Sequence, residues 1–102
     1  MKECAFFGSF DPITYGHLDV IKRALTMFNK IHIVVGVNSS KSCVFSVEDR
    51  KKFIENAIKA PNSGISRDRV YIAHDSGLAV DYMTRNHVCA TIRGIRNSAD
   101  YE

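Results

Sequence analysis

Short apolar runs alternate along this chain with longer stretches in which apolar residues recur at helical spacing. The runs are apolar and partly β-branched, which favours strands. They lie at residues 4–7, 31–37, 70–73 and 89–92. After the first run, one helical stripe is formed by Leu18, Ile21, Leu25 and Phe28. This spacing predicts a helix over residues 17–28.

The same spacing predicts two further helices. Ser46 can cap the second helix, and Asp49 three residues later makes a plausible capping box. Its stripe consists of Val47, Arg50, Ile54 and Ile58, of which Arg50 is the polar exception. Pro61 ends this helix. The third helix begins near Leu78, where apolar residues again recur at helical spacing.

Strands that alternate with helices predict a parallel sheet, because parallel neighbours need crossover connections. We therefore predict an α/β fold with a Rossmann-like parallel sheet, in a single domain over residues 1–102. Right-handed crossovers would bring the carboxyl ends of all strands to one edge. Ligands bind at that edge in open α/β sheets, so the segments after the predicted strands are where a site is expected.

The segment after the first predicted strand, from Gly8 to His17, has the residues that a phosphate site needs. Gly8 permits a close turn, and Ser9 offers a hydroxyl and a backbone N–H. His17 falls in the first helical turn, where free N–H groups and the helix dipole favour phosphate and a neutral imidazole. A polar loop followed by an exposed histidine is the plain alternative, and it would suffice for a lone histidine. That alternative does not account for the whole segment from Gly8 to His17. Neither of the commoner phosphate loops, G-x-x-x-x-G-K-S/T or G-x-G-x-x-G, is present.

Composition narrows the class of ligand. The net charge is +3 and no basic run accompanies it, which favours a small anionic ligand over nucleic acid. Three well-separated cysteines without a C-x-x-C pair fit a reducing cytoplasm, and Cys4 and Cys89 are expected in the core. No apolar stretch is long enough to span a bilayer, so no membrane association is expected.

Basic residues follow two of the other predicted strands. Arg93 and Arg96 come directly after the fourth, where guanidinium groups suit a phosphate. Lys41 follows the second and, taken alone, could be an ordinary solvated lysine. His74 follows the third strand with its role open, and His32 is expected on a polar strand face. The histidines show no metal-ligand spacing.

Together these segments resemble the phosphopantetheine adenylyltransferase family of the nucleotidyltransferase superfamily. G-S-F-D-P-I-T-Y-G-H at residues 8–17 is similar to the superfamily signature T/H-x-G-H. Thr14 stands where cytidylyltransferases and nicotinamide-mononucleotide adenylyltransferases usually have a histidine. Further segments that resemble the family, in the same order, are residues 39–41, 45–50, 76–82, 92–96 and 99–102.

The resemblance implies transfer of AMP from ATP to 4′-phosphopantetheine, giving dephospho-coenzyme A and pyrophosphate, with Mg²⁺ required. His17 would be the catalytic residue that stabilises the transition state. ATP contacts would come from Ser9, Phe10, His17, Gly94, Ile95 and Arg96. Contacts to 4′-phosphopantetheine would come from Ser9, Lys41, Ala79 and Arg93. Members of the family are usually hexamers, so a homo-oligomer is expected. We assign no residue of this chain as a metal ligand.

The family pattern continues beyond Glu102 with an acidic ATP contact and a loop that grips the triphosphate. We therefore expect the N-terminal portion of a longer family domain, a sheet incomplete at the C-terminus, and little activity from these 102 residues alone. Two alternatives stay open. One is another nucleotidyltransferase, such as a cytidylyltransferase or nicotinamide-mononucleotide adenylyltransferase, against which Thr14 counts. The other is a nucleotide-binding fragment without catalysis.

Overall fold

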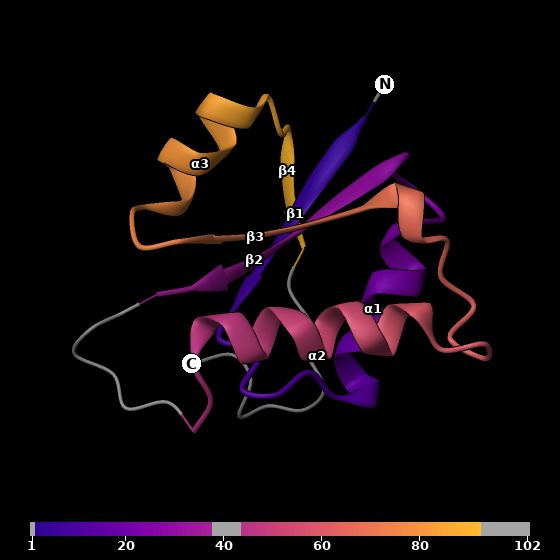
Figure 1. The fold of residues 1–102 in the computed structure, drawn as a ribbon. Helices are drawn as coiled ribbons and strands as arrows, with labels where there is room; N and C mark the ends of the chain where they lie inside the picture. Colours follow the sequence, from indigo (N-terminus) through magenta and orange to yellow (C-terminus); the bar gives the residue numbers. More distant parts are fainter. Residues whose placement is uncertain (1, 38–43, 93–102) are drawn as a thin grey trace, which may run out of the picture.

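The computed structural model describes residues 2–37 and 44–92, and its strands and helices alternate along the chain (Figure 1). In order they are β1 (Glu3–Gly8), α1 (Tyr15–Ala24), β2 (Lys30–Gly36), α2 (Val47–Lys59), the 3-10 helix η1 (Arg67–Arg69), β3 (Val70–Asp75), α3 (Ala79–Asn86) and β4 (Ala90–Ile92). The alternation predicted from the apolar spacing is confirmed.

The strands form one parallel sheet in the order β3-β2-β1-β4. β1 pairs with β2 along its whole length, from Glu3 opposite Lys30 to Gly8 opposite Val35. On its other edge β1 pairs with β4, with Cys4 opposite Ala90. The chain thus steps from β1 through β2 to β3 and then crosses back to place β4 on the far side of β1. The predicted parallel α/β sheet is confirmed.

Helices cover both faces of the sheet, with α1 and α2 on one side and α3 on the other (Figure 1). In the larger core, Ile21 of α1 and Ile54 of α2 belong to the same buried cluster as Ile33 of β2. In the smaller core, Tyr82 of α3 lies with Val34 of β2. Five consecutive residues of β2 are buried, which is the pattern of a strand covered on both faces.

α1 ends at Ala24, earlier than the predicted end at Phe28. The guanidinium group of Arg69 donates to the carbonyl oxygens of Leu25, Phe28 and Asn29, at 2.8, 2.9 and 3.0 Å. These bonds satisfy carbonyl groups that the end of a helix leaves free, so the chain can turn toward β2. The apolar spacing runs on because Leu25 and Phe28 still pack against the core.

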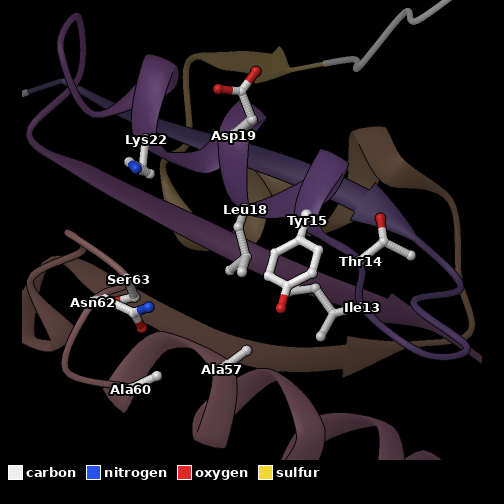
Figure 2. Close-up of a pocket in the computed structure, with 10 residues that line it drawn as sticks. All are labelled: Ile13, Thr14, Tyr15, Leu18, Asp19, Lys22, Ala57, Ala60, Asn62 and Ser63. Carbon is white, nitrogen blue, oxygen red and sulfur yellow. The ribbon is translucent and has the colours of Figure 1, made fainter.

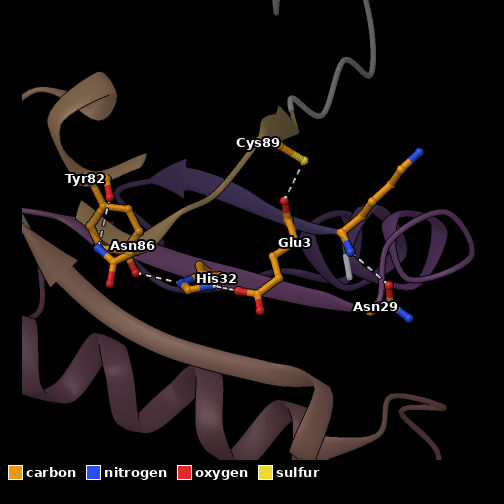
Figure 3. A network of polar contacts seen from close by, with 7 residues as sticks. Glu3, Asn29, His32, Tyr82, Asn86 and Cys89 are labelled. Atoms are coloured by element: carbon orange, nitrogen blue, oxygen red, sulfur yellow. Dashed lines mark hydrogen bonds and ion pairs between the residues drawn. The ribbon is translucent and has the colours of Figure 1, made fainter. Parts of the chain in front are cut away.

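His32 corrects the expectation of a polar strand face, because its side chain is buried between β1 and α3. One ring nitrogen, Nε2, lies 2.6 Å from Oε1 of Glu3, and the other, Nδ1, lies 2.9 Å from the Tyr82 hydroxyl (Figure 3). A buried polar group is tolerated when its hydrogen-bonding atoms have partners. The same burial raises the pKa of Tyr82 to about 12, with Tyr71 adding a smaller effect.

The two described cysteines differ in exposure. Cys4 is buried, as expected, and burial raises the pKa of its thiol to about 11, with nearby Cys89 as the smaller cause. Cys89 was expected in the core and is exposed instead. It lies just before β4, where its Sγ contacts the carbonyl oxygen of Glu3 at 3.4 Å (Figure 3). The apolar run therefore predicted the strand to begin one residue too early.

Candidate active site

The carboxyl ends of the strands meet at one edge of the sheet, as predicted. β1 ends at Gly8, β2 at Gly36, β3 at Asp75 and β4 at Ile92. The direction of the crossovers changes at β1, because β2 is added on one side and β4 on the other. Such a switch point opens a crevice outside the carboxyl ends of the strands. The segment after β1 therefore begins where α/β sheets bind ligands.

Phe10 fixes the turn that follows β1. Its φ of 47° lies in the left-handed region, which residues other than glycine rarely adopt. Its ring is 1% exposed and packs edge-on against Phe6 and His17, with ring centroids 5.2 and 4.9 Å apart. Burial of the ring offsets the cost of the backbone conformation. Because the whole residue is buried, the ATP contact expected at Phe10 stays a prediction.

His17 closes a reciprocal cap at the start of α1. Its backbone N–H donates to Oγ1 of Thr14 at 3.3 Å, and the Thr14 N–H donates to Nδ1 of the imidazole at 2.9 Å. The Thr14 hydroxyl also lies 3.1 Å from Nδ1. Since Nδ1 accepts a hydrogen bond, the neutral ring carries its proton on Nε2. The helix start that the sequence predicted for phosphate thus holds an imidazole in one orientation and one tautomer.

Arg50 connects the ends of β1 and β2 from α2. Its guanidinium Nη1 donates to the carbonyl oxygen of Ser9 at 2.8 Å and to that of Gly36 at 3.2 Å. The side chain is 4% exposed. In the sequence, Arg50 stands out as the polar exception on the apolar stripe of α2. An arginine at a core position needs buried acceptors, and here the fold supplies them.

Asp11 makes a second connection from the β1–α1 loop. Its two carboxylate oxygens accept hydrogen bonds from the backbone N–H groups of Val44 and Phe45, at 2.6 and 2.8 Å. These residues lead into α2, whose N-cap Ser46 accepts from the N–H of Asp49, as predicted. The β1–α1 loop therefore contacts both the end of β2 and the approach to α2.

The third crossover begins with a turn held by Asp75. Its carboxylate accepts from the Gly77 N–H at 2.7 Å and from the Arg85 guanidinium at 2.6 Å. The hydrogen bond from the Gly77 N–H lowers the pKa of Asp75, and the hydrogen bond from Arg85 lowers it further by a smaller effect. Ala79 is the first residue of α3 and is exposed at this edge. His74, whose role was open, lies with Nδ1 3.1 Å from Nζ of Lys51.

The predicted site residues divide into those the structure describes and those it does not. Ser9, Phe10 and His17 lie on the β1–α1 connection, and Ala79 lies at the start of α3. The predictions outside the described residues are Lys41, Arg93, Gly94, Ile95 and Arg96. Arg50 and Asp11 are the contacts that sequence reasoning did not assign to the site.

A groove of about 780 Å³ runs between α1 and α2 (Figure 2). It is lined by Ile13, Thr14, Tyr15, Leu18, Asp19, Lys22, Ala57, Ala60, Asn62 and Ser63. The groove touches the cap of α1 only through Thr14. Its lining does not include Ser9 or His17, so it is distinct from the loop at the switch point.

Two kinds of feature are absent from the part of the chain that the structure describes. No three His, Cys, Asp or Glu side chains within it are placed to hold a metal ion together. No helix in that part has the length and apolar character needed to cross a membrane.

Comparison with known proteins places these observations in a family. The cytidylyltransferase-like family model matches residues 5–100. Phosphopantetheine adenylyltransferase of Thermotoga neapolitana is 43% identical over 95 residues, covering 93% of this chain and 55% of that protein. The enzyme of the same name from Levilactobacillus brevis is 44% identical over 103 residues, covering 100% and 60%. The chain thus spans little more than half the length of these curated relatives.

Solved structures share the fold. A bifunctional NMN adenylyltransferase/ADP ribose pyrophosphatase of Francisella tularensis, complexed with AMP and a manganese ion, matches with a TM-score of 0.64 and 30% identity. The match covers 83% of this chain and 25% of that one. Nicotinic acid mononucleotide adenylyltransferase of Plasmodium falciparum matches with a TM-score of 0.68 at 21% identity, over 89% and 49% of the two chains. The second match supports the fold alone.

Proposed function

Because the chain belongs to the cytidylyltransferase-like family, we propose that it forms part of an adenylyltransferase that transfers AMP from ATP to 4′-phosphopantetheine. An oxygen of the acceptor phosphate bonds to the α-phosphorus of ATP as the bond from that phosphorus to pyrophosphate breaks. The products are dephospho-coenzyme A and pyrophosphate. The names of the relatives at 43% and 44% identity support this acceptor.

The observation that carries the proposal is the reciprocal cap of Thr14 and His17. Because the Thr14 N–H occupies Nδ1, the proton of the neutral ring lies on Nε2. We assign this N–H as a donor to an α-phosphate oxygen, whose negative charge grows as the acceptor attacks. A donor fixed in place before the reaction stabilises that charge without reorganisation. The first turn of α1 adds backbone N–H groups and the positive end of the helix dipole.

The remaining roles concern positioning and charge. Ser9 would contact both substrates, and Lys41 with Arg93 would hold the acceptor phosphate. Gly94, Ile95 and Arg96 would contact ATP, and Ala79 would line the pantetheine arm. Phosphoryl-type transfer depends chiefly on alignment of the substrates and neutralisation of their charge. The placement of Ser9, His17 and Ala79 at one edge of the sheet supports these assignments.

Magnesium enters this proposal as part of the substrate MgATP. Among residues 2–37 and 44–92 no group of three potential ligands forms a metal site. Both carboxylate oxygens of Asp11 already accept backbone N–H groups. Mg²⁺ commonly remains on substrate phosphates with few protein ligands, so we assign it to ATP.

The test uses the complete product of the gene that encodes this chain. MgATP is supplied with 4′-phosphopantetheine, with pantetheine, or with nicotinamide mononucleotide, and pyrophosphate and the adenylylated product are measured. We expect turnover with 4′-phosphopantetheine and far less with pantetheine, because a site built for a phosphate leaves its charges unpaired without one. Preferential turnover of nicotinamide mononucleotide would contradict the proposal.

A further inference from the structure

Arg50 occupies a core position that an aliphatic residue would fill at lower cost. Ile54 and Ile58 lie on the same buried stripe of α2. Among the described residues, Nε of Arg50 is buried and has no hydrogen-bond partner. A buried charged group with an unpaired N–H lowers stability, and replacing such a group with apolar side chains is often neutral or favourable. Stability of α2 alone therefore does not explain an arginine here.

Among the described residues, Arg50 donates hydrogen bonds to the ends of two strands at the candidate site. Nη1 reaches the carbonyl oxygens of Ser9 and Gly36, which follow β1 and end β2. Ser9 belongs to the loop that leads to His17, and Gly36 begins the connection to α2. One guanidinium group thus spans two loops that leave adjacent strands, and it does so from a third element.

Asp11 makes the complementary contact at the other end of the same connection. The carboxylate binds the N–H groups of Val44 and Phe45. The β2–α2 connection, which contains Lys41, is therefore held at both of its ends against the β1–α1 loop. Arg50 holds the end near Gly36, and Asp11 holds the end near Val44.

We propose that Arg50 is a positioning residue, which together with Asp11 couples the loop of Ser9 and His17 to the connection that carries Lys41. This inference rests on the proposed function, because it assigns the two loops to the two substrates. ATP bound along the first loop then favours, through these contacts, the acceptor-binding position of the second, so each substrate raises the affinity for the other. Arg50 acts through the backbone of these loops and touches neither substrate.

The test compares Arg50→Met and Arg50→Lys with Lys52→Met, which removes a charge from an exposed position of α2. Amide hydrogen exchange is measured in the complete gene product. We expect Arg50→Met to accelerate exchange at Val44 and Phe45 by about tenfold or more, because the connection that they end then loses its charged hydrogen-bond donor at Gly36. In the same variant, exchange at Ile33 in the core should change much less. Lys52→Met should leave exchange unchanged both at Ile33 and at Val44 and Phe45. Arg50→Lys keeps the positive charge but loses the planar array of guanidinium N–H donors. Its exchange rates at Val44 and Phe45 should lie between those of wild type and Arg50→Met.

Ligand titration supplies the second readout. The affinity for 4′-phosphopantetheine is measured with and without a saturating ATP analogue that cannot transfer its nucleotide. In wild type the analogue should raise that affinity severalfold, and in Arg50→Met the ratio should approach one. Uniform acceleration of exchange, or an unchanged ratio, would show a merely structural role and overturn the inference. Failure of wild type to bind either ligand would instead overturn the proposed function.

Discussion

A Cβ atom added to Gly8 would lie 3.1 Å from Cε2 of the Phe10 ring, closer than most real Cβ contacts. The glycine that ends β1 therefore makes room for the buried ring that shapes the next turn. We expect Gly8→Ala to push this ring toward His17 and to lower the free energy of unfolding by about 1 kcal/mol. Chemical denaturation measures this change. Gly36→Ala is the matched control, because its Cβ would meet the nearest atom, the Gly8 carbonyl oxygen, at an ordinary 3.6 Å. Equal effects of the two substitutions would contradict the prediction.

Thr14→Val tests how much the helix cap contributes to stability and turnover. The substitution keeps the shape of the side chain but removes the hydroxyl that accepts from the His17 N–H. We expect a loss of about 1 kcal/mol in unfolding free energy, the usual cost of removing an N-cap. Turnover in the complete gene product should fall as well, because the imidazole loses a partner. Thr14→Ser retains the hydroxyl and should retain both properties; a Ser variant as impaired as the Val variant would argue against the cap.

His17→Ala should lower kcat much more than it weakens ATP binding. The reason is that a hydrogen bond which strengthens only in the transition state contributes to the rate and not to ground-state affinity. The expected loss in kcat is on the order of 10²- to 10³-fold, the effect of removing one oxyanion donor. Steady-state kinetics with varied MgATP measures it. A raised KM with near-normal kcat would show that His17 only binds ATP.

Tyr82→Phe should make stability less sensitive to alkaline pH. The pKa of Tyr82 is raised to about 12 in the folded protein by burial, against about 10 in an unfolded chain. The corresponding stabilisation is complete below pH 10 and is lost as the pH rises toward 12, because only the unfolded chain ionises in that range. Unfolding free energies measured across this range should therefore fall more steeply for wild type than for Tyr82→Phe. Equal slopes of unfolding free energy against pH for the two proteins would contradict a raised pKa of Tyr82.

Asp75→Asn should make stability less sensitive to acid pH. The pKa of Asp75 is lowered by the Gly77 N–H and by Arg85. Its stabilisation is therefore present above the unfolded pKa of about 4 and is lost as the pH falls through the lower folded pKa. Acid titration of wild type should show a decline in stability that the Asn variant shows less strongly. Asp19→Asn is a suitable control, since Asp19 is also paired with an arginine but lies at an exposed position of α1.

The apolar pattern carried enough information for the order of the elements and the parallel sheet, because both depend on which residues are buried. The place of the loop after β1 at the carboxyl edge was predicted for a related reason, since right-handed crossovers between parallel strands bring all carboxyl ends to one edge. The early end of α1 could not be predicted, because it is accompanied by hydrogen bonds from Arg69, which lies forty or more positions along the chain.

Polar groups in the core were the harder part to predict. His32 is acceptable in a buried strand only because Glu3 and Tyr82, from two other elements, pair with its ring. Arg50 is likewise explained only by carbonyl groups that the fold brings to it. In both cases the residue type signals solvent exposure, and the partner that reverses this signal is known only when the fold is known.

The place of β4 in the sheet has a kinetic consequence. Cys89 and Glu3, which meet where β4 joins β1, are 86 positions apart, whereas β2 and β3 are each added by the next crossover along the chain. Closing so large a loop is slow relative to forming local contacts. We therefore expect β1, β2 and β3 to assemble first, with β4 as the last of the four described strands to dock. Among the described residues, the switch point between β1 and β4 would then be the last part to form, and a ligand bound there would slow the first step of unfolding.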